Sequence, residues 1–281
     1  MSIEPTALTN APIIVADSIT TVPGSSRRPV IVNGSHCGLI AARFASNHNP
    51  IGVIFNDAGI GLDGAGISGL KLLNSIGIPA ATVGYNTARI GDGADMMTRG
   101  RISHCNELAS QIGVVPDLRC EEAAKIMASA QTPDCFDVSP TEEIRRCVAT
   151  GLIEVWLLDS ASLVQPSDAG HIVITGSHGG LIGGDWSKAI KAPVLYAVFN
   201  DAGIGIDTAG IGRLDALASQ GIAAATVSAN TAKIGDATST WETGEISACN
   251  KIAMTRGVTP GLSTIESVDR LRLIPSTERS L

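Results

Sequence analysis

The sequence predicts an α/β fold formed by tandem duplication of a Rossmann-like three-layer unit with mainly parallel strands. The seven letters Phe-Asn-Asp-Ala-Gly-Ile-Gly occur twice, at 55–61 and at 199–205. Each copy follows an apolar run and precedes a segment with apolar residues at helical spacing, which is the order strand, turn, helix. Over half of the aligned positions between Phe55 and Leu118 are identical in the second copy. We therefore expect two copies that pack with pseudo-twofold symmetry.

The repeat also predicts the domain organisation. Residues 1–130 are expected to form the first α/β repeat, residues 131–150 a linker and residues 151–281 the second repeat. Alternation of strands and helices implies parallel strands with right-handed crossovers. Helices are predicted over 38–48, 63–76 and 101–112, and over the equivalent segments 180–190, 207–220 and 245–256.

Composition and charge restrict the class of partner. The chain is 44% hydrophobic and 17% charged, which is typical of a globular protein. A net charge of -7 without clustered Lys and Arg argues against a nucleic-acid partner. No apolar run approaches the roughly 20 residues that span a bilayer, and the N-terminus has no basic region followed by an apolar stretch. We expect a cytoplasmic protein without a membrane partner, and the sequence leaves a homo-oligomer open.

Three polar turns in each copy are predicted at the carboxyl ends of neighbouring strands: Gly-Ser-His, Asn-Asp-Ala-Gly and Asn-Thr-Ala-Arg/Lys-Ile-Gly-Asp. These ends share one rim of a parallel sheet, so their side chains can converge. A titratable base, carboxylates, amides and a cation suit a small polar substrate, which we expect to be anionic. The candidate catalytic residues are His36, Cys37, Asp57, His178 and Asp201. The candidate substrate-binding residues are Ser35, Asn56, Asn86, Thr87, Arg89, Ser177, Asn200, Asn230, Thr231 and Lys233.

Each candidate has a structural alternative. The histidines could bond to the backbone of their turns, and Asp57 and Asp201 could accept from the turn that follows them. A cysteine beside a histidine at a helix start could be a nucleophile, but the position of Cys37 is Gly179 in the second copy. A further set of acids is predicted to cap helices or to lie in first turns, namely Asp63, Asp92, Asp207 and Asp236.

No cofactor is predicted. The stretch 59–64 fits the pattern G-x-G-x-x-G, but Thr208 replaces the third glycine in the second copy and acidic residues flank the turn. No spacing indicates a metal site, although His36, Asp57 and Asp92 could together hold a divalent ion.

We interpret the set as the site of a metabolic enzyme, in the first place a hydrolase of a small polar carbonyl- or amide-containing acid. His36 would be the general base, oriented by Asp57, while Asn56 and Asn86 donate to the oxyanion and Arg89 holds a carboxylate. A lyase or isomerase that moves a proton next to a carbonyl needs the same groups. A non-catalytic regulatory protein that binds a small molecule is the remaining alternative. The two rims could form one composite site or two separate ones.

Overall fold

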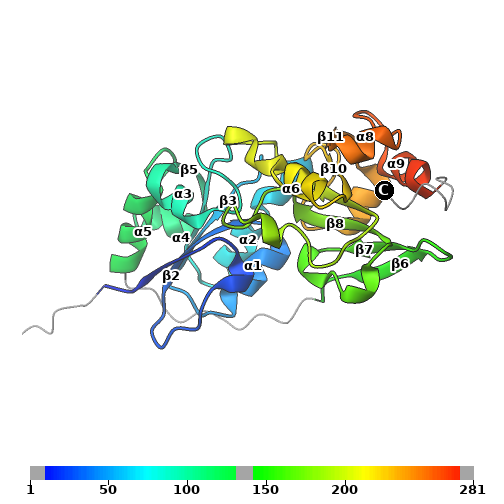
Figure 1. The fold of residues 1–281 in the computed structure, drawn as a ribbon. Helices are drawn as coiled ribbons and strands as arrows, with labels where there is room; N and C mark the ends of the chain where they lie inside the picture. Colours follow the sequence, from blue (N-terminus) through cyan, green and yellow to red (C-terminus); the bar gives the residue numbers. More distant parts are fainter. Residues whose placement is uncertain (1–9, 131–141, 273–281) are drawn as a thin grey trace, which may run out of the picture.

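The structure is a computed structural model that describes residues 10–130 and 142–272. These residues form two α/β halves that lie side by side, with one sheet in each (Figure 1). Both sheets are mostly parallel, and one has five strands and the other six. The predicted α/β class and the mainly parallel strands are confirmed.

The first half contains a sheet in the order β1-β2-β3-β4-β5, in which only β5 is antiparallel to its neighbour. Helices cover both faces, with Ala42 and Leu73 packed on one face and Met96 and Met127 on the other. The strands are β1 (Ile13–Ala16), β2 (Val30–His36), β3 (Gly52–Asn56), β4 (Ala80–Val83) and β5 (Ile102–Cys105). The helices are η1 (Ile19–Thr21), α1 (Leu39–Ser46), η2 (Leu62–Ile67), α2 (Gly69–Ser75), α3 (Gly93–Arg99), α4 (Glu107–Gln111) and α5 (Cys120–Ser129).

The second half contains a sheet in the order β11-β10-β9-β8-β7-β6, and its two outer strands are antiparallel to their neighbours. Its two faces are again covered, by Leu217 on one side and Leu271 on the other. The strands are β6 (Arg145–Ala149), β7 (Val155–Leu158), β8 (Ile172–His178), β9 (Tyr196–Asn200), β10 (Ala223–Val227) and β11 (Ile246–Cys249). The helices are η3 (Ala161–Leu163), η4 (Pro166–Asp168), η5 (Trp186–Lys188), η6 (Ile206–Ile211), α6 (Arg213–Ser219), α7 (Ala237–Thr243), α8 (Lys251–Thr255) and α9 (Thr264–Arg272).

The strands of each sheet follow one another in sequence order from one edge to the other. A doubly wound sheet of the Rossmann type reverses this order, and its ligand binds in the crevice at the reversal. Neither sheet has such a reversal among the described strands. A crevice at the carboxyl ends of these strands therefore has to come from the approach of the two halves.

Several predicted elements differ from the structure. The helices expected over 101–112 and 245–256 begin as the antiparallel strands β5 and β11, and only their second parts are helical. The helix expected over 180–190 is replaced by a loop and η5, because Gly183 and Gly184 take left-handed φ angles of 62° and 68°. In the expected linker, residues 145–149 form β6, and residues 131–141 lie outside the described part of the chain.

The repeated Asn-Asp turns join the two halves. Asp57 Oδ1 accepts from the backbone N–H groups of Gly59, at 3.1 Å, and of Tyr85, at 2.9 Å. The carbonyl of Tyr85 then accepts from Ile206 N of the other half, at 2.9 Å.

The second copy repeats this arrangement in the opposite direction. Asp201 Oδ1 accepts from Gly203 N at 2.9 Å and from Ala229 N at 2.8 Å, and the carbonyl of Ala229 accepts from Leu62 N at 2.7 Å. Between the two turns lies a small apolar cluster of Ala58, Ile90, Ala202 and Ile234. The repeated acids therefore form part of the contact between the halves.

We expect Asp57→Ala and Asp201→Ala each to lower the free energy of unfolding by about 2–4 kcal/mol, because each change leaves two largely buried N–H groups without an acceptor. Denaturation in urea measures the effect. Asn230→Ala is the control, since Asn230 is exposed, and it should change the value by less than about 0.5 kcal/mol. Lost function with unchanged stability in the aspartate variants would contradict this structural role.

Candidate functional site

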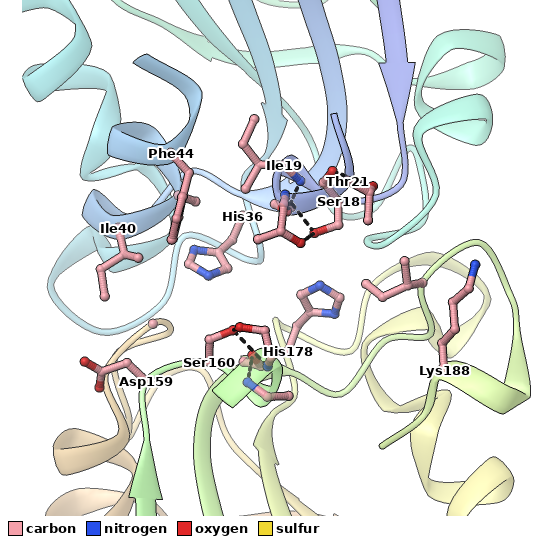
Figure 2. A pocket seen from close by; sticks show the side chains of 18 of the residues that line it. Ser18, Ile19, Thr21, His36, Ile40, Phe44, Asp159, Ser160, His178 and Lys188 are labelled. Atoms are coloured by element: carbon pink, nitrogen blue, oxygen red, sulfur yellow. Dashed lines mark hydrogen bonds between the residues drawn. The ribbon is translucent and has the colours of Figure 1, made fainter. Parts of the chain in front are cut away.

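A cavity of about 500 Å³ lies between the two halves. His36 and His178 extend into it from opposite sides, each at the carboxyl end of its strand (Figure 2). Ile40 and Phe44 form part of an apolar wall, and serines from both halves form much of the polar lining. The Gly-Ser-His turns of both copies thus meet in one composite cavity.

A break in strand pairing places each histidine. The register of β2 against β3 shifts between Val32 and His36, and that of β8 against β9 shifts between Ile174 and His178. Gly34 lies inside the first of these breaks, where a Cβ would lie 2.5 Å from Asp92 N, so only glycine fits without moving the backbone.

The serines of these turns hold the neighbouring 3-10 helices. Ser35 Oγ accepts from Ile19 N at 3.0 Å, and Ser177 Oγ accepts from Ala161 N at 2.9 Å. Both serines also line the cavity.

Both imidazoles are hydrogen-bonded through Nδ1. The Nδ1 atom of His36 accepts from Gly38 N at 3.0 Å, and that of His178 accepts from Gly180 N at 3.1 Å. Desolvation by burial lowers the pKa of His36 to about 4. It also lowers the pKa of His178 well below its ordinary value, and the charges of Arg213 and His36 act in the same direction. A neutral imidazole whose Nδ1 accepts a hydrogen bond carries its proton on Nε2, so at neutral pH both rings are N–H donors.

Each ring packs against the other half. A Cβ at Gly235 would lie 3.1 Å from Cε1 of His36, and a Cβ at Gly91 would lie 3.4 Å from Cε1 of His178. These glycines belong to the repeated Ile-Gly-Asp turns, whose aspartates Asp92 and Asp236 cap α3 and α7 as predicted. The Ile-Gly-Asp turns thus help to enclose the cavity.

Several charged groups in the lining were not among the predicted site residues: Glu143, Asp159, Lys188, Lys191 and Arg213. Asp159 accepts from Ile144 N at 2.8 Å and from Ala237 N at 3.0 Å, so both of its oxygens are engaged. Desolvation and the nearby charge of Asp159 raise the pKa of the half-buried Glu143. The repeated Asp-Ser pair at 159–160 was a usable signal in the sequence, whereas Glu143 and Arg213 have no repeated counterpart.

Most of the other predicted site residues lie outside the lining of this cavity. Asn56 bonds to Ala88 O and Ala58 N, and Asn200 makes the equivalent bonds in the second half. The hydroxyl of Thr87 donates to Gly84 O in its own loop and accepts from Arg101 N. Thr231 makes the equivalent bonds, to Ser228 O and from Glu245 N. Asn86 and Asn230 are exposed. The buried asparagines and the threonines therefore support the loops around the cavity, and none of these six side chains lines it.

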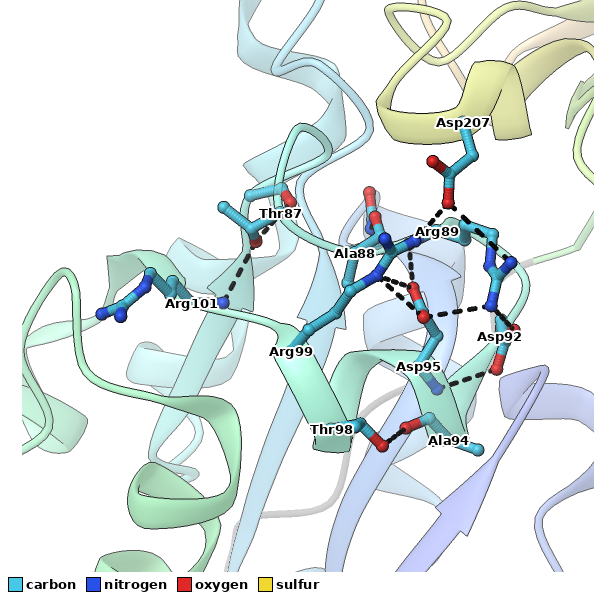
Figure 3. A network of polar contacts seen from close by, with 12 residues as sticks. Thr87, Ala88, Arg89, Asp92, Ala94, Asp95, Thr98, Arg99, Arg101 and Asp207 are labelled. Carbon is cyan, nitrogen blue, oxygen red and sulfur yellow. Dashed lines mark hydrogen bonds and ion pairs between the residues drawn. The ribbon is translucent and has the colours of Figure 1, made fainter.

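The predicted cations Arg89 and Lys233 take part in ion pairs on the outside of the molecule. Arg89 contacts Asp95 at 3.1 Å, in a network that also joins Arg99 to Asp207 at 2.6 Å (Figure 3). Lys233 contacts Asp63 at 2.9 Å. The Arg99–Asp207 and Lys233–Asp63 pairs each connect one half to the other.

Asp63 and Asp207 lie in the first turns of η2 and η6, as expected for first-turn acids, but they are not the capping residues. The positions before these helices are Gly61 and Gly205. The two aspartates have left-handed φ angles of 53° and 55°. Their side chains accept from the cations of the opposite half.

Cys37 is fully buried in the apolar core of the first half. Burial raises the pKa of its thiol, so the thiolate needed for nucleophilic attack is disfavoured. The equivalent Gly179 has no room for a side chain, since a Cβ there would lie 2.5 Å from Gly210 O. Packing, and not reactivity, accounts for this difference between the copies.

Within the described residues, no group of three or more His, Cys, Asp or Glu side chains is arranged to hold a metal ion, and His36, Asp57 and Asp92 form no such group. The same part of the chain has no helix with the length and apolar character to cross a membrane. Comparisons of the chain with protein-family models, curated proteins and solved structures found no significant match.

The lowered pKa of His36 predicts a pH dependence of stability. Between its ordinary pKa of 6.5 and its folded-state pKa of about 4, the unfolded chain binds a proton that the folded protein does not. The free energy of unfolding should therefore fall as the pH falls from 7 to 5, by about 2 kcal/mol from this one group. In urea denaturation at both pH values, the free energy of unfolding should fall less for His36→Gln than for the wild type. An equal fall in the wild type and in His36→Gln would contradict the lowered pKa of His36.

We expect Cys37 to resist alkylation by iodoacetamide in the native protein, because its thiol is buried and protonated. Cys147, which is only half-buried, should react faster and serves as the internal comparison. Mass spectrometry of tryptic peptides measures both, before and after unfolding in guanidinium. Rapid labelling of Cys37 in the folded protein would restore it as a candidate nucleophile.

Proposed function

We propose that the cavity between the halves is the site of an enzyme that moves a proton on the carbon next to the carbonyl of a small molecule. The observation that carries this proposal is the pair of histidines that line one cavity, each with Nδ1 accepting a backbone N–H. This arrangement leaves the Nε2–H of each neutral ring to donate to a ligand. Neutral N–H donors fixed in a desolvated site stabilise the negative charge that develops on a carbonyl oxygen when a neighbouring proton leaves. The volume of about 500 Å³ suits a small ligand.

Glu143 is the best candidate for the base in this proposal. It lines the same cavity, and its raised pKa makes it a stronger base than an exposed glutamate. A proton would pass from the substrate carbon to the Glu143 carboxylate, while the electron pair of the broken C–H bond delocalises onto the carbonyl oxygen. Return of the proton to a different atom gives an isomerase. Loss of a neighbouring leaving group gives a lyase.

The geometry favours this reaction over the hydrolysis that the sequence first suggested. A general base for water needs a free lone pair, but Nδ1 of His36 already accepts from Gly38 N. Asp57 does not orient His36, because its Oδ1 accepts from Gly59 and Tyr85. Binding without turnover remains the second candidate, since fixed donors around an apolar cavity suit a binding protein equally well.

We further propose that the two halves arose by tandem duplication and pack with pseudo-twofold symmetry. Reciprocal contacts support it: Leu62 N donates to Ala229 O, and the equivalent Ile206 N donates to Tyr85 O. The packing of the histidines is reciprocal as well, because His36 lies against Gly235 and His178 lies against the equivalent Gly91. Such symmetry would place two equivalent donors around one ligand.

Proton exchange in D₂O tests the proposed reaction. We expect the protein to exchange the protons next to the carbonyl in some member of a panel of small 2-oxo acids, ketones, aldehydes and amides, followed by NMR. Glu143→Gln should slow exchange by about 10²- to 10⁴-fold without abolishing binding, since it removes only the base. Each histidine-to-glutamine change should also slow it, by loss of a donor to the developing oxyanion.

Glu142→Gln is the matched control, because Glu142 is the exposed neighbour of Glu143 and does not line the cavity. Its exchange rate should equal that of the wild type. A compound that raises the melting temperature of the wild type but never exchanges would instead support the binding protein. Release of ammonia from an amide in the panel would support the hydrolase.

A further inference from the structure

Arg213 is a buried cation in the wall of the cavity. It is the first residue of α6, and only 5% of it is exposed. Its Nε donates to Gly180 O at 2.9 Å, its Nη1 donates to Ala189 O, and the guanidinium lies 5.1 Å from the ring centroid of Phe199. These contacts hold the guanidinium in a fixed orientation.

No carboxylate neutralises this charge within the described part of the chain. The arginines of the outer network and Arg145 each have an aspartate or glutamate within 4.0 Å, whereas Arg213 has none. Its Nη2 also makes no hydrogen bond to the described residues. Burial lowers the pKa of Arg213 to about 10, so the group is still charged at neutral pH. An uncompensated buried charge is costly, and an anion in the cavity would offset that cost.

The first half has no counterpart to this cation. The repeat places Gly69 where the second half has Arg213, and a Cβ at Gly69 would lie 2.6 Å from the Cβ of Ala42 in α1. In the second half, the loop that replaces α1 leaves space for the arginine and supplies both carbonyls that it binds. Among the described residues that line the cavity, the buried guanidinium therefore lies on the side of the second half.

We propose that Arg213 binds the carboxylate of a 2-oxo acid and so fixes the substrate in one orientation. The carboxylate would lie against the second half, and the adjacent carbonyl oxygen would face the Nε2–H groups of the histidines. A planar guanidinium with free N–H groups suits a carboxylate in this role. The carboxylate site is independent of any reaction, while the placement of the carbonyl rests on the function proposed above.

The competing explanation is that Arg213 only fills the space left by the missing helix. Pyruvate and its neutral amide, pyruvamide, separate the two explanations, because they share their shape and differ in charge. We expect the wild type to bind pyruvate more tightly than pyruvamide by on the order of 10- to 100-fold in calorimetry. Arg213→Gln should remove this preference and leave the affinity for pyruvamide within about twofold.

Lys188→Gln changes a second cation of the lining, one that is exposed and paired with Asp185, and should keep the preference for pyruvate. Arg213→Lys keeps the positive charge but lacks the planar N–H donors of the guanidinium, so its preference for pyruvate over pyruvamide should be smaller than that of the wild type. This variant also tests the proposal if Arg213→Gln does not fold. The proposal is overturned if the wild type binds neither pyruvate nor pyruvamide, or binds both with equal affinity. It is also overturned if the Arg213 variants lose affinity for both compounds to the same extent. Selective binding of pyruvate without proton exchange would uphold Arg213 as the carboxylate site and overturn only the proposed reaction.

Discussion

The arrangement of the two halves depends on two buried carboxylates that never reach the cavity. Asp57 and Asp201 each accept from the N–H of their own turn and from the N–H of a neighbouring loop. The carbonyl of that loop residue then receives a hydrogen bond from the opposite half. Each half donates one such hydrogen bond and accepts the other, so a single arrangement of the two halves satisfies both. Together with the apolar cluster between the turns and the ion pairs of the outer surface, this contact joins the halves around the cavity.

Burial changes the chemistry available to the histidines. In water an imidazole near neutral pH alternates between base and acid, but a desolvated ring with Nδ1 engaged by a backbone amide stays neutral. His36 and His178 thereby become fixed donors on opposite sides of the cavity (Figure 2). The charge that a carbonyl develops during enolisation is the kind of charge such donors stabilise. The same desolvation makes the half-buried Glu143 a better base.

Differences between the copies matter as much as their identities. The Asn-Asp turns are identical in both copies. The residues that bond across the halves differ, Leu62 against Ile206 and Tyr85 against Ala229, because they bond through backbone atoms. The faces behind the histidines diverge: α1 packs on Gly69 in the first half, whereas Arg213 occupies the matching position in the second. The backbone contacts between the halves thus recur in both directions, whereas the buried guanidinium of the described cavity lining belongs to the second half.

The sequence by itself determined the α/β class, the parallel strands and the position of the Gly-Ser-His turns, because these depend on local periodicity and on residues close together in the chain. Capping by Asp92 and Asp236 followed for the same reason. Tertiary structure decided which polar turns face a cavity: Ser35, His36, Ser177 and His178 do, whereas Asn56, Asp57 and their counterparts bond to backbone. It also decided that Arg89 and Lys233 pair with acids of the other half, and that Arg213 and Glu143 enter the site. These outcomes depend on contacts between residues far apart in the chain, and local sequence patterns carry no information about which distant groups will become neighbours.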